Sequence, residues 1–352
     1  MKKYIFILVG LLTTQIRADA VVSVALEQGY NSNLFNDSLE FDDSYTSIIT
    51  DILVYPFEIA EIDIFGDFYK YSKFNDLSNF NGGFSVTLIP TDVYCRSQIY
   101  LNSSLAFLNY GNDFKIYNTR TINANSSWNY LLSNKVTTKI GVGASSVSYT
   151  SSTSVDDRIL YGFAGFNLTF FSKNSFDFET AYYNKKFLTD DSFNSKNSYV
   201  DLLARYSRPL SSSLGFKLSY LHRILSDAED TFMPGFTVDY LSPWATLWSG
   251  EEVNLSLKKI FPQAIVVSLQ YTYNNKEYIN QLELDSSSQS MYSTSYREDY
   301  SNAYYLTIEK EISLNSKILI PQLYIYMQNN NSSNNYYTYN KLSIYGSLNL
   351  SF

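Results

Sequence analysis

Apolar and polar residues alternate along most of this chain, and the alternation restricts the fold more than any other feature of the sequence. In one typical segment, Ile265, Val267 and Leu269 share one side of an extended backbone, while Ser268 and Gln270 lie on the other side. Side chains of a β-strand alternate between its two faces, so a period of two predicts strands with one apolar and one polar face. Repeated segments of this kind, with charges on the polar faces, predict a transmembrane β-barrel.

The connections between these segments alternate in length. Seven short turns are predicted at 56–59, 90–93, 132–135, 172–174, 208–212, 261–263 and 313–316. Eight longer polar loops are predicted at 31–43, 72–83, 108–116, 150–157, 187–197, 225–245, 278–298 and 329–339. Outer-membrane barrels have short periplasmic turns and long outer loops. The sequence therefore predicts an all-β, antiparallel up-and-down barrel of about 16 strands, with 14 to 18 left open because 225–245 could contain a further strand.

The first 20 residues have the features of a secretory signal peptide. Lys2 and Lys3 precede a short apolar run, and a small-residue cleavage site follows at 18–20. The run is too short to span a bilayer as a helix, which needs about 20 apolar residues. We expect cleavage after residue 20, which leaves 21–352 as a single barrel domain.

Charge and cysteine content exclude several classes of partner. The formal net charge is −8, and removal of residues 1–20 takes away three basic residues and one acidic residue, which makes it −10. Nucleic acid is not an expected partner, because phosphate binding requires clustered Lys and Arg. Cys95 is the only cysteine, so an intramolecular disulfide and a multi-cysteine metal site are excluded. No metal and no cofactor is predicted.

A catalytic role is not expected either. An enzyme that uses a histidine base would need His222, the only histidine of the chain. His222 shares its strand parity with Leu218 and Tyr220, which points it outward near the outer rim. No serine or carboxylate motif accompanies it, so the sequence does not predict an enzyme.

The polar faces of the strands would line a channel. A barrel of 16 strands is wide enough to enclose water, whereas eight strands would be filled by side chains. By parity, the predicted lining residues are the acidic Asp63, Asp67, Asp177, Glu179, Asp201 and Glu309 and the basic Lys139, Arg205, Lys217 and Lys258. Opposed acidic and basic sectors would impose a transverse field on the opening and orient dipolar solutes.

The 225–245 loop has two interpretations. Its acidic residues Asp227, Glu229 and Asp230, with Trp244 and Trp248 beyond, could fold inward and narrow the channel. It could equally be an exposed surface loop. The sequence leaves both interpretations open.

The end of the chain resembles that of Gram-negative outer-membrane β-barrels. Leu348, Leu350 and Phe352 share one face of the last predicted strand, which finishes on the aromatic residue. This ending is similar to the terminal signal that the barrel-assembly machinery reads. The resemblance implies a location in the outer membrane of a Gram-negative bacterium, contact with membrane lipid and lipopolysaccharide, recognition by that machinery and, by analogy with porins of this width, a homotrimer.

The start of the predicted barrel, at 21–37, resembles the β-barrel porin 2 type. Proteins of this type commonly hold a Tyr-x-Ser-Asn element in the first loop, which here lies at 30–33. The favoured function is an outer-membrane channel for passive diffusion of small hydrophilic solutes. Some relatives of this type sit among exopolysaccharide export functions. Export or surface attachment is therefore the alternative, with Tyr69, Tyr183 and Tyr305 as a stacking track for glycan.

Overall fold

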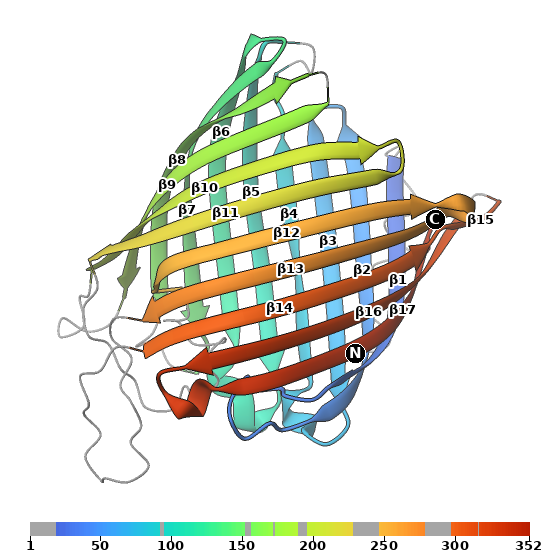
Figure 1. Ribbon diagram of the computed structural model, residues 1–352, viewed down its shortest axis with the longest axis vertical. Coiled ribbons are helices and arrows are strands. Elements are labelled where there is room, and N and C mark those ends of the chain that lie inside the picture. The colour runs from blue at the N-terminus through green and yellow to red at the C-terminus, as the bar shows by residue number, and fades with distance from the viewer. Residues whose placement is uncertain are drawn as a thin grey trace.

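The computed structural model describes residues 19–91, 95–151, 156–171, 173–188, 196–227, 246–278, 297–315 and 317–352. Its strands form one antiparallel sheet that closes on itself into an up-and-down barrel (Figure 1). Sixteen long strands make the ring, and a three-residue strand, β15 (Ile312–Leu314), extends the turn between β14 and β16. The predicted fold class and strand number are confirmed.

The long strands contain 10 to 16 residues each, enough to cross a bilayer at a tilt. They are β1 (Asp19–Asn31), β2 (Asp43–Phe57), β3 (Ala60–Tyr71), β4 (Asn79–Leu88), β5 (Ser97–Tyr110), β6 (Thr119–Ser133), β7 (Val136–Tyr149), β8 (Asp157–Phe170), β9 (Asn174–Phe187), β10 (Lys196–Ser211), β11 (Leu214–Asp227), β12 (Ser249–Phe261), β13 (Ile265–Tyr278), β14 (Arg297–Lys310), β16 (Lys317–Ser332) and β17 (Tyr339–Ser351). β1 begins at Asp19, two residues before the predicted start of the first strand at 21. Residues 1–18 of the predicted signal peptide lie outside the described residues.

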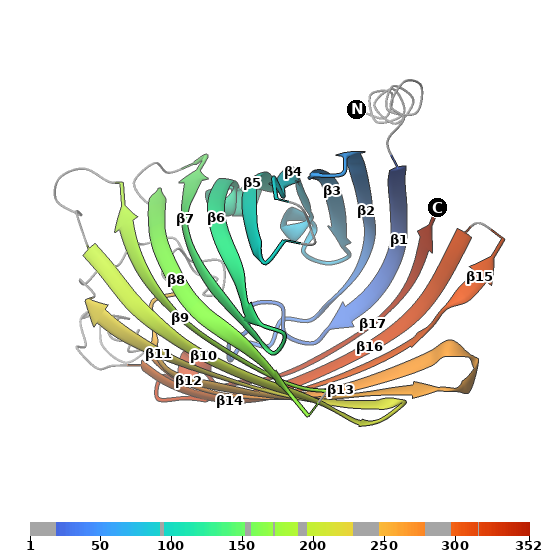
Figure 2. The same cartoon turned by 90° about the horizontal axis from the view of Figure 1, so that it is seen from above.

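β1 closes the barrel. It pairs antiparallel with β2 on one side and with β17 on the other, and Figure 2 shows it standing between them. Val22 donates its backbone N–H to the carbonyl of Phe352 at 2.9 Å, and Phe352 donates its own to the carbonyl of Val22 at 3.0 Å. Every backbone polar group inside hydrocarbon needs such a partner, so closure is a requirement for a spanning sheet.

The two ends of the barrel carry different connections. Two-residue turns join β2 to β3, β6 to β7 and β10 to β11, whereas the opposite end carries the long loops. Three of the long loops contain a short 3₁₀ helix each: η1 (Asn75–Leu77), η2 (Asn112–Tyr117) and η7 (Asn335–Tyr337). Another 3₁₀ helix, η6 (Pro262–Ala264), lies in the short turn between β12 and β13. β11 pairs directly with β12, so the ring is complete without a strand from the 225–245 loop, whose residues 228–245 lie outside the described residues.

No helix among the described residues has the length and apolar character needed to cross a membrane.

The two faces of the sheet differ in polarity. The largest side chains that the described part of the chain buries completely are Asn33, Asn197, Asp43, Asp157 and Ser47. The outward face is apolar, and Val142 and Leu160 are 63% and 59% exposed there. The barrel therefore has a polar interior and an outer surface that requires lipid, the reverse of a soluble domain.

Register keeps these two faces separate along each strand. The shifts among the described pairings occur near strand ends, at 54–57, 131–133, 198–199 and 209–211. A bulge within a span would turn the polar residues toward lipid. Their position at the ends preserves one inward face across the membrane.

Candidate functional site

Register places all ten charged residues predicted for the channel on the inward face. Residues that pair directly across neighbouring strands face the same side of the sheet. Followed from strand to strand, the pairings put the ten residues on the same side as Ser47 and Thr272, which are buried. The residues are Asp63, Asp67, Lys139, Asp177, Glu179, Asp201, Arg205, Lys217, Lys258 and Glu309. They lie on two walls of the barrel that differ in charge: one carries carboxylates alone, and the other carries cations together with carboxylates.

The first wall, formed by β1–β6, is acidic near its start and uncharged beyond. Asp51, Asp63 and Asp67 face inward on β2 and β3, and Asp67 accepts a hydrogen bond from Asn81 Nδ2 at 3.3 Å. Across β4–β6 the inward side chains are mostly Asn, Ser and Thr, joined by side-chain hydrogen bonds. No Lys or Arg faces inward among the described residues of β1–β6.

The second wall, formed by β7–β14, carries cations bound to carboxylates. Lys139 Nζ lies 2.6 Å from Glu179 Oε2 and 3.5 Å from Asp177 Oδ2. Arg205 Nη1 lies 3.0 Å from Asp177 Oδ1. The network links β7, β9 and β10 and largely neutralises its own charges.

Arg223 on β11 forms a largely buried ion pair of this wall. Its Nε and Nη2 atoms donate to the two carboxylate oxygens of Asp201, both at 2.7 Å. The guanidinium lies 4.3 Å from the ring centroid of Tyr199 and 4.4 Å from that of Trp248. A bidentate carboxylate and two aromatic faces satisfy a planar cation well, so this pair holds the wall together.

The predicted constriction residues fall at the edge of what the structure describes. Asp227 is the last residue of β11, and Glu229 and Asp230 lie outside the described residues. Directly after the same connection, Leu247 and Trp248 are buried, and Leu247 packs with Tyr199 inside the barrel. The described end of the connection therefore turns inward.

The first loop, 32–42, folds across the outer end of the barrel. Asn33 is fully buried and holds the loop by donating from Nδ2 to the carbonyl of Asp37 at 2.7 Å. Phe35 contacts Phe74 of the β3–β4 loop and stacks on Phe114 of η2, with ring centroids 5.6 and 6.1 Å apart. Asp37 is bound by Tyr336 of η7, whose hydroxyl donates to Asp37 Oδ2 at 3.1 Å. Sequence reasoning missed these contacts of the first loop, although the Tyr-x-Ser-Asn element at 30–33 leads into it.

Two groups in the outer loops have shifted pKa values. The Lys73 ammonium donates a hydrogen bond to Asp42 at 2.6 Å and lowers the pKa of that carboxyl. Burial raises the pKa of the Tyr336 hydroxyl, and the nearby Asp37 charge raises it further. At neutral pH, Asp42 is therefore charged and Tyr336 keeps the proton that it donates to Asp37.

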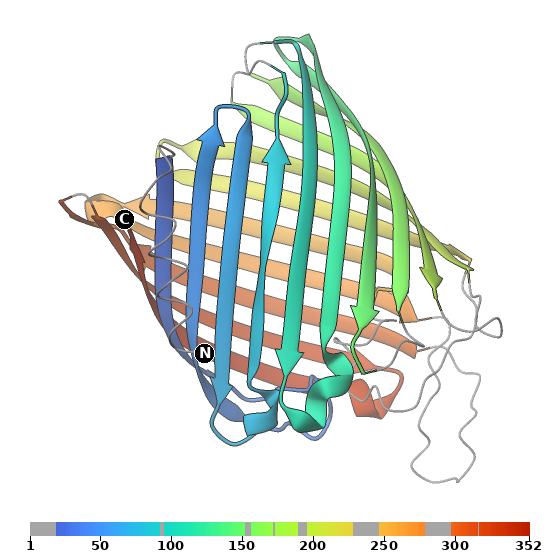
Figure 3. The same ribbon diagram turned by 180° about the vertical axis from the view of Figure 1, so that it is seen from behind.

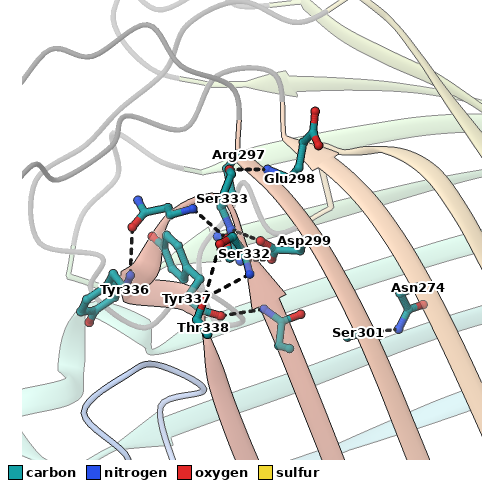
Figure 4. A network of polar contacts seen from close by, with 12 residues as sticks. Asn274, Arg297, Glu298, Asp299, Ser301, Ser332, Ser333, Tyr336, Tyr337 and Thr338 are labelled. Atoms are coloured by element: carbon teal, nitrogen blue, oxygen red, sulfur yellow. Dashed lines mark hydrogen bonds and ion pairs between the residues drawn. The ribbon is translucent and has the colours of Figure 1, made fainter.

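A polar corner forms where β14 meets η7 (Figure 4). Arg297 donates to both carboxylate oxygens of Asp299 and lies 3.4 Å from the ring centroid of Tyr337. On the neighbouring strands, Asn274 Nδ2 donates to Ser301 Oγ at 3.0 Å. Arg297, Asp299, Asn274 and Ser301 are among the residues that line a cavity of about 320 Å³. The first loop reaches the same cavity, because its Asn36 is a lining residue.

A band of tyrosines crosses the inward face from β14 to β3. Its members are Tyr45, Tyr69, Tyr71, Tyr305, Tyr324, Tyr326 and Tyr345. Tyr324 stacks on Tyr345 with ring centroids 4.4 Å apart. Gly29 lies between Tyr345 and Tyr45 in register, and a Cβ atom there would lie 2.6 Å from the Tyr45 ring. Glycine at this position allows the band to continue across β1.

Lys341 supplies a cation beside this band. It lines the same cavity of about 340 Å³, and its Nζ donates to Asn36 Oδ1 at 2.8 Å. In the part of the chain that the structure describes, no carboxylate lies within ion-pair distance of this ammonium. The alternation of the last strand already placed Lys341 on its polar face, but no sequence signal indicated that it would lack an acidic partner.

The predicted stacking tyrosines do not form one track. Tyr69 and Tyr305 belong to the band, whereas Tyr183 stacks on Tyr199 in the second wall with ring centroids 4.6 Å apart. His222 faces outward, and its Nδ1 atom lies 3.8 Å from Glu251 Oε1.

Comparison with known proteins identifies the fold. No protein-family model and no curated protein sequence matches the chain. The crystal structure of OccK1 (OpdK) of Pseudomonas aeruginosa has a TM-score of 0.55 and 9% identity, with 95% of this chain and 99% of that chain covered. OpdK is an outer membrane protein. This chain has the fold of a Gram-negative outer-membrane porin.

Two further structures share the fold. Pseudomonas aeruginosa OpdK with vanillate has a TM-score of 0.56 at 10% identity, with 95% of this chain and 99% of that chain covered. Acinetobacter baumannii OccAB3 has a TM-score of 0.51 at 10% identity, with 95% and 100% covered. The likeness extends over the whole barrel, and at these identities it concerns the fold alone.

Proposed function

We propose that the protein is a porin-like channel of the outer membrane through which small hydrophilic solutes diffuse passively. The observation that carries the proposal is a closed ring of 16 long strands whose inward face carries charged side chains on two walls. A ring of this size encloses an aqueous path. Transport then depends on the width and charge of the path and requires no catalytic group.

Charge and shape favour solutes that carry a charge or a dipole. Asp51, Asp63 and Asp67 attract positive groups toward the first wall. Lys341 and the tyrosine band fit a negative group attached to a planar ring. OpdK has been crystallised with vanillate, and vanillate combines a carboxylate with an aromatic ring. Small aromatic carboxylates are therefore suitable test solutes.

The first loop, 32–42, is the constriction in this proposal, and Asp227, Glu229 and Asp230 would narrow the path further if their connection continues inward. Leu348, Leu350 and Phe352 would form the signal for the barrel-assembly machinery. We also infer a homotrimer, by analogy of fold, and contact with lipopolysaccharide. The alternative of exopolysaccharide export receives no support from the tyrosines, which stand in two separate groups.

Conductance in planar lipid bilayers tests the channel directly. The folded barrel is expected to produce discrete single-channel steps in potassium chloride. Heat-denatured protein at the same concentration is the control and should produce none. A folded barrel that never conducts would contradict the proposal.

A Lys341→Met variant tests the solute site. Benzoate should block the wild-type current, and loss of the ammonium should weaken that block about tenfold, the usual effect of removing one charged hydrogen bond. Benzyl alcohol has the same ring without the charge, so its weak effect should not change. The matched control is Lys217→Met, since Lys217 is an exposed inward cation outside the cavity. Equal weakening in both variants would show that Lys341 forms no specific site.

A further inference from the structure

Three cations face the membrane at the outer ends of neighbouring strands. Arg120 is the second residue of β6, Arg158 the second residue of β8, and Lys186 the last residue but one of β9. All three side chains are exposed. The adjacent Lys185 points the other way and is buried 3.0 Å from Asp157. Lys185 therefore forms an ion pair inside the barrel, whereas Lys186 faces outward.

These cations have no acidic partner among the described residues. Arg158 and Lys186 lie directly opposite each other in register, an arrangement of like charges that destabilises a sheet. Arg120 lies two strands away, and its guanidinium is 5.4 Å from the ring centroid of Phe107. Among the described residues, no carboxylate lies within ion-pair distance of any of the three. The arrangement is explained if an anion from outside the protein binds between them.

The outward surface below these cations is apolar. On these strands Ile122, Leu160 and Tyr182 are each at least half exposed, and so is Val142 on β7 between them. Figure 3 shows these strands side by side. A ligand that fits their outward face carries negative charge at the outer rim and hydrocarbon beneath it. This is the chemistry of a phosphorylated lipid.

The cationic patch is local to one sector of the barrel. At the same height on β12–β14, the outward side chains include Glu251, Glu277 and Glu298, and the last two lie opposite each other in register. A general preference for basic residues at the outer rim would not leave that sector acidic. The positive charge is therefore a property of β6–β9 and not of the whole outer rim.

We propose that Arg120, Arg158 and Lys186 bind the phosphate groups of a lipopolysaccharide molecule in the outer leaflet. The long loops identify their end of the barrel as the outer one, and lipopolysaccharide places its phosphates at the top of the acyl chains there. Guanidinium and ammonium groups are the usual phosphate ligands of proteins. The site is independent of the proposed channel, because it lies on the opposite face of the same strands.

Lipid A binding to the purified folded barrel in detergent, measured by native mass spectrometry, tests the site. A triple variant Arg120→Gln, Arg158→Gln, Lys186→Gln is expected to bind lipid A about a hundredfold more weakly, since each cation near an anionic surface contributes about fivefold. A single Arg158→Gln variant should lose about fivefold. Heat-dependent gel mobility shows whether each variant is folded.

Two controls make the result specific. Lys70→Gln removes a lone outward cation at the outer end of β3 and should leave binding unchanged. Dephosphorylated lipid A should bind the wild type as weakly as lipid A binds the triple variant.

Four outcomes would overturn the proposal. The first is wild-type affinity of the folded triple variant, and the second is equal affinity of the wild type for dephosphorylated lipid A. The third is equal affinity for phosphatidylglycerol or competition by inorganic phosphate alone, either of which would reveal a general anion site. The fourth is a changed oligomeric state of the triple variant with unchanged lipid A binding, which would assign the patch to a second copy of the chain.

Discussion

The two inner walls of the barrel use their charges differently. On β1–β3 the inward carboxylates Asp51, Asp63 and Asp67 have no cationic partner among the described residues, and Asp67 is bonded to an amide. On β7–β14 most inward cations are held by carboxylates, as the pairs of Arg205 and Arg223 show. The charges of the second wall therefore stabilise the barrel, and those of the first wall are the ones that a passing solute meets.

This difference sharpens the expectation of a transverse field. Opposed acidic and basic sectors would create one if both were free, but paired charges largely cancel at a distance. The field of the proposed channel therefore arises mainly from the acidic first wall, and among the described residues Lys217 and Lys341 are inward cations without an ion pair.

Deletion of Phe352 tests the seam where the first wall ends, and its expected effect is the largest. The deletion removes both backbone hydrogen bonds between Phe352 and Val22, together with the proposed assembly signal. The amount of folded protein in the outer membrane should fall several-fold, measured by heat-dependent gel mobility of membrane fractions. Single channels that do assemble should conduct normally. Deletion that leaves assembly unchanged would show that the terminal residue is dispensable.

Asp201→Ala tests the structural role of the second wall. It leaves the Arg223 guanidinium without its carboxylate in a mostly buried site, which typically lowers the free energy of unfolding by about 3 kcal/mol. Urea unfolding of the refolded barrel, followed by tryptophan fluorescence, measures the change. Asp67→Ala is the matched control on the first wall and should cost less than about 1 kcal/mol. Equal losses would mean that the walls do not differ in this way.

Neutralising the first wall tests its role in selectivity. The triple variant Asp51→Asn, Asp63→Asn, Asp67→Asn keeps the size of the side chains and removes three charges. The ratio of cation to anion permeability should fall by roughly threefold, because local cation concentration follows the wall potential. Reversal potentials in a potassium chloride gradient give the ratio. Arg205→Gln on the second wall should change it less.

Asn33→Ala tests the proposed constriction and is expected to leave the barrel itself unchanged. It removes the side-chain hydrogen bonds between Asn33 and the backbone of Asp37. Each such bond contributes about 1 kcal/mol, so the loss of both should make the first loop open roughly thirtyfold more often. Single-channel records would then show more frequent transitions to a higher conductance. If the variant shows no additional transitions and the same conductance as the wild type, the first loop is not the constriction.

The sequence predicts the barrel well because its governing constraint is local. Alternation and connection length follow from the bilayer itself, so the strand number is correct without knowledge of tertiary contacts. Parity identifies which side chains of a strand share a face, because no register shift interrupts the spans.

Contacts between distant segments could not be predicted in this way. The inward fold of the first loop depends on Phe35 meeting Phe74 and Phe114, and nothing in the local pattern distinguishes these rings from surface residues. The pairing of Arg223 with Asp201, and the lack of such a pairing for Lys341, depend on register between neighbouring strands. A single sequence contains no measure of that register.

The seam between β1 and β17 has a consequence for how the protein folds. Ser23 and Ser351, whose hydroxyl groups lie 2.8 Å apart across it, are separated by 328 positions in the chain. The entropy of joining distant residues grows slowly with their separation, by about 0.6 kcal/mol per doubling, but contacts of such long range form late and slowly. Until they form, the sheet has two open edges that can pair with other chains. The last step of folding is therefore also the step that ends the risk of aggregation.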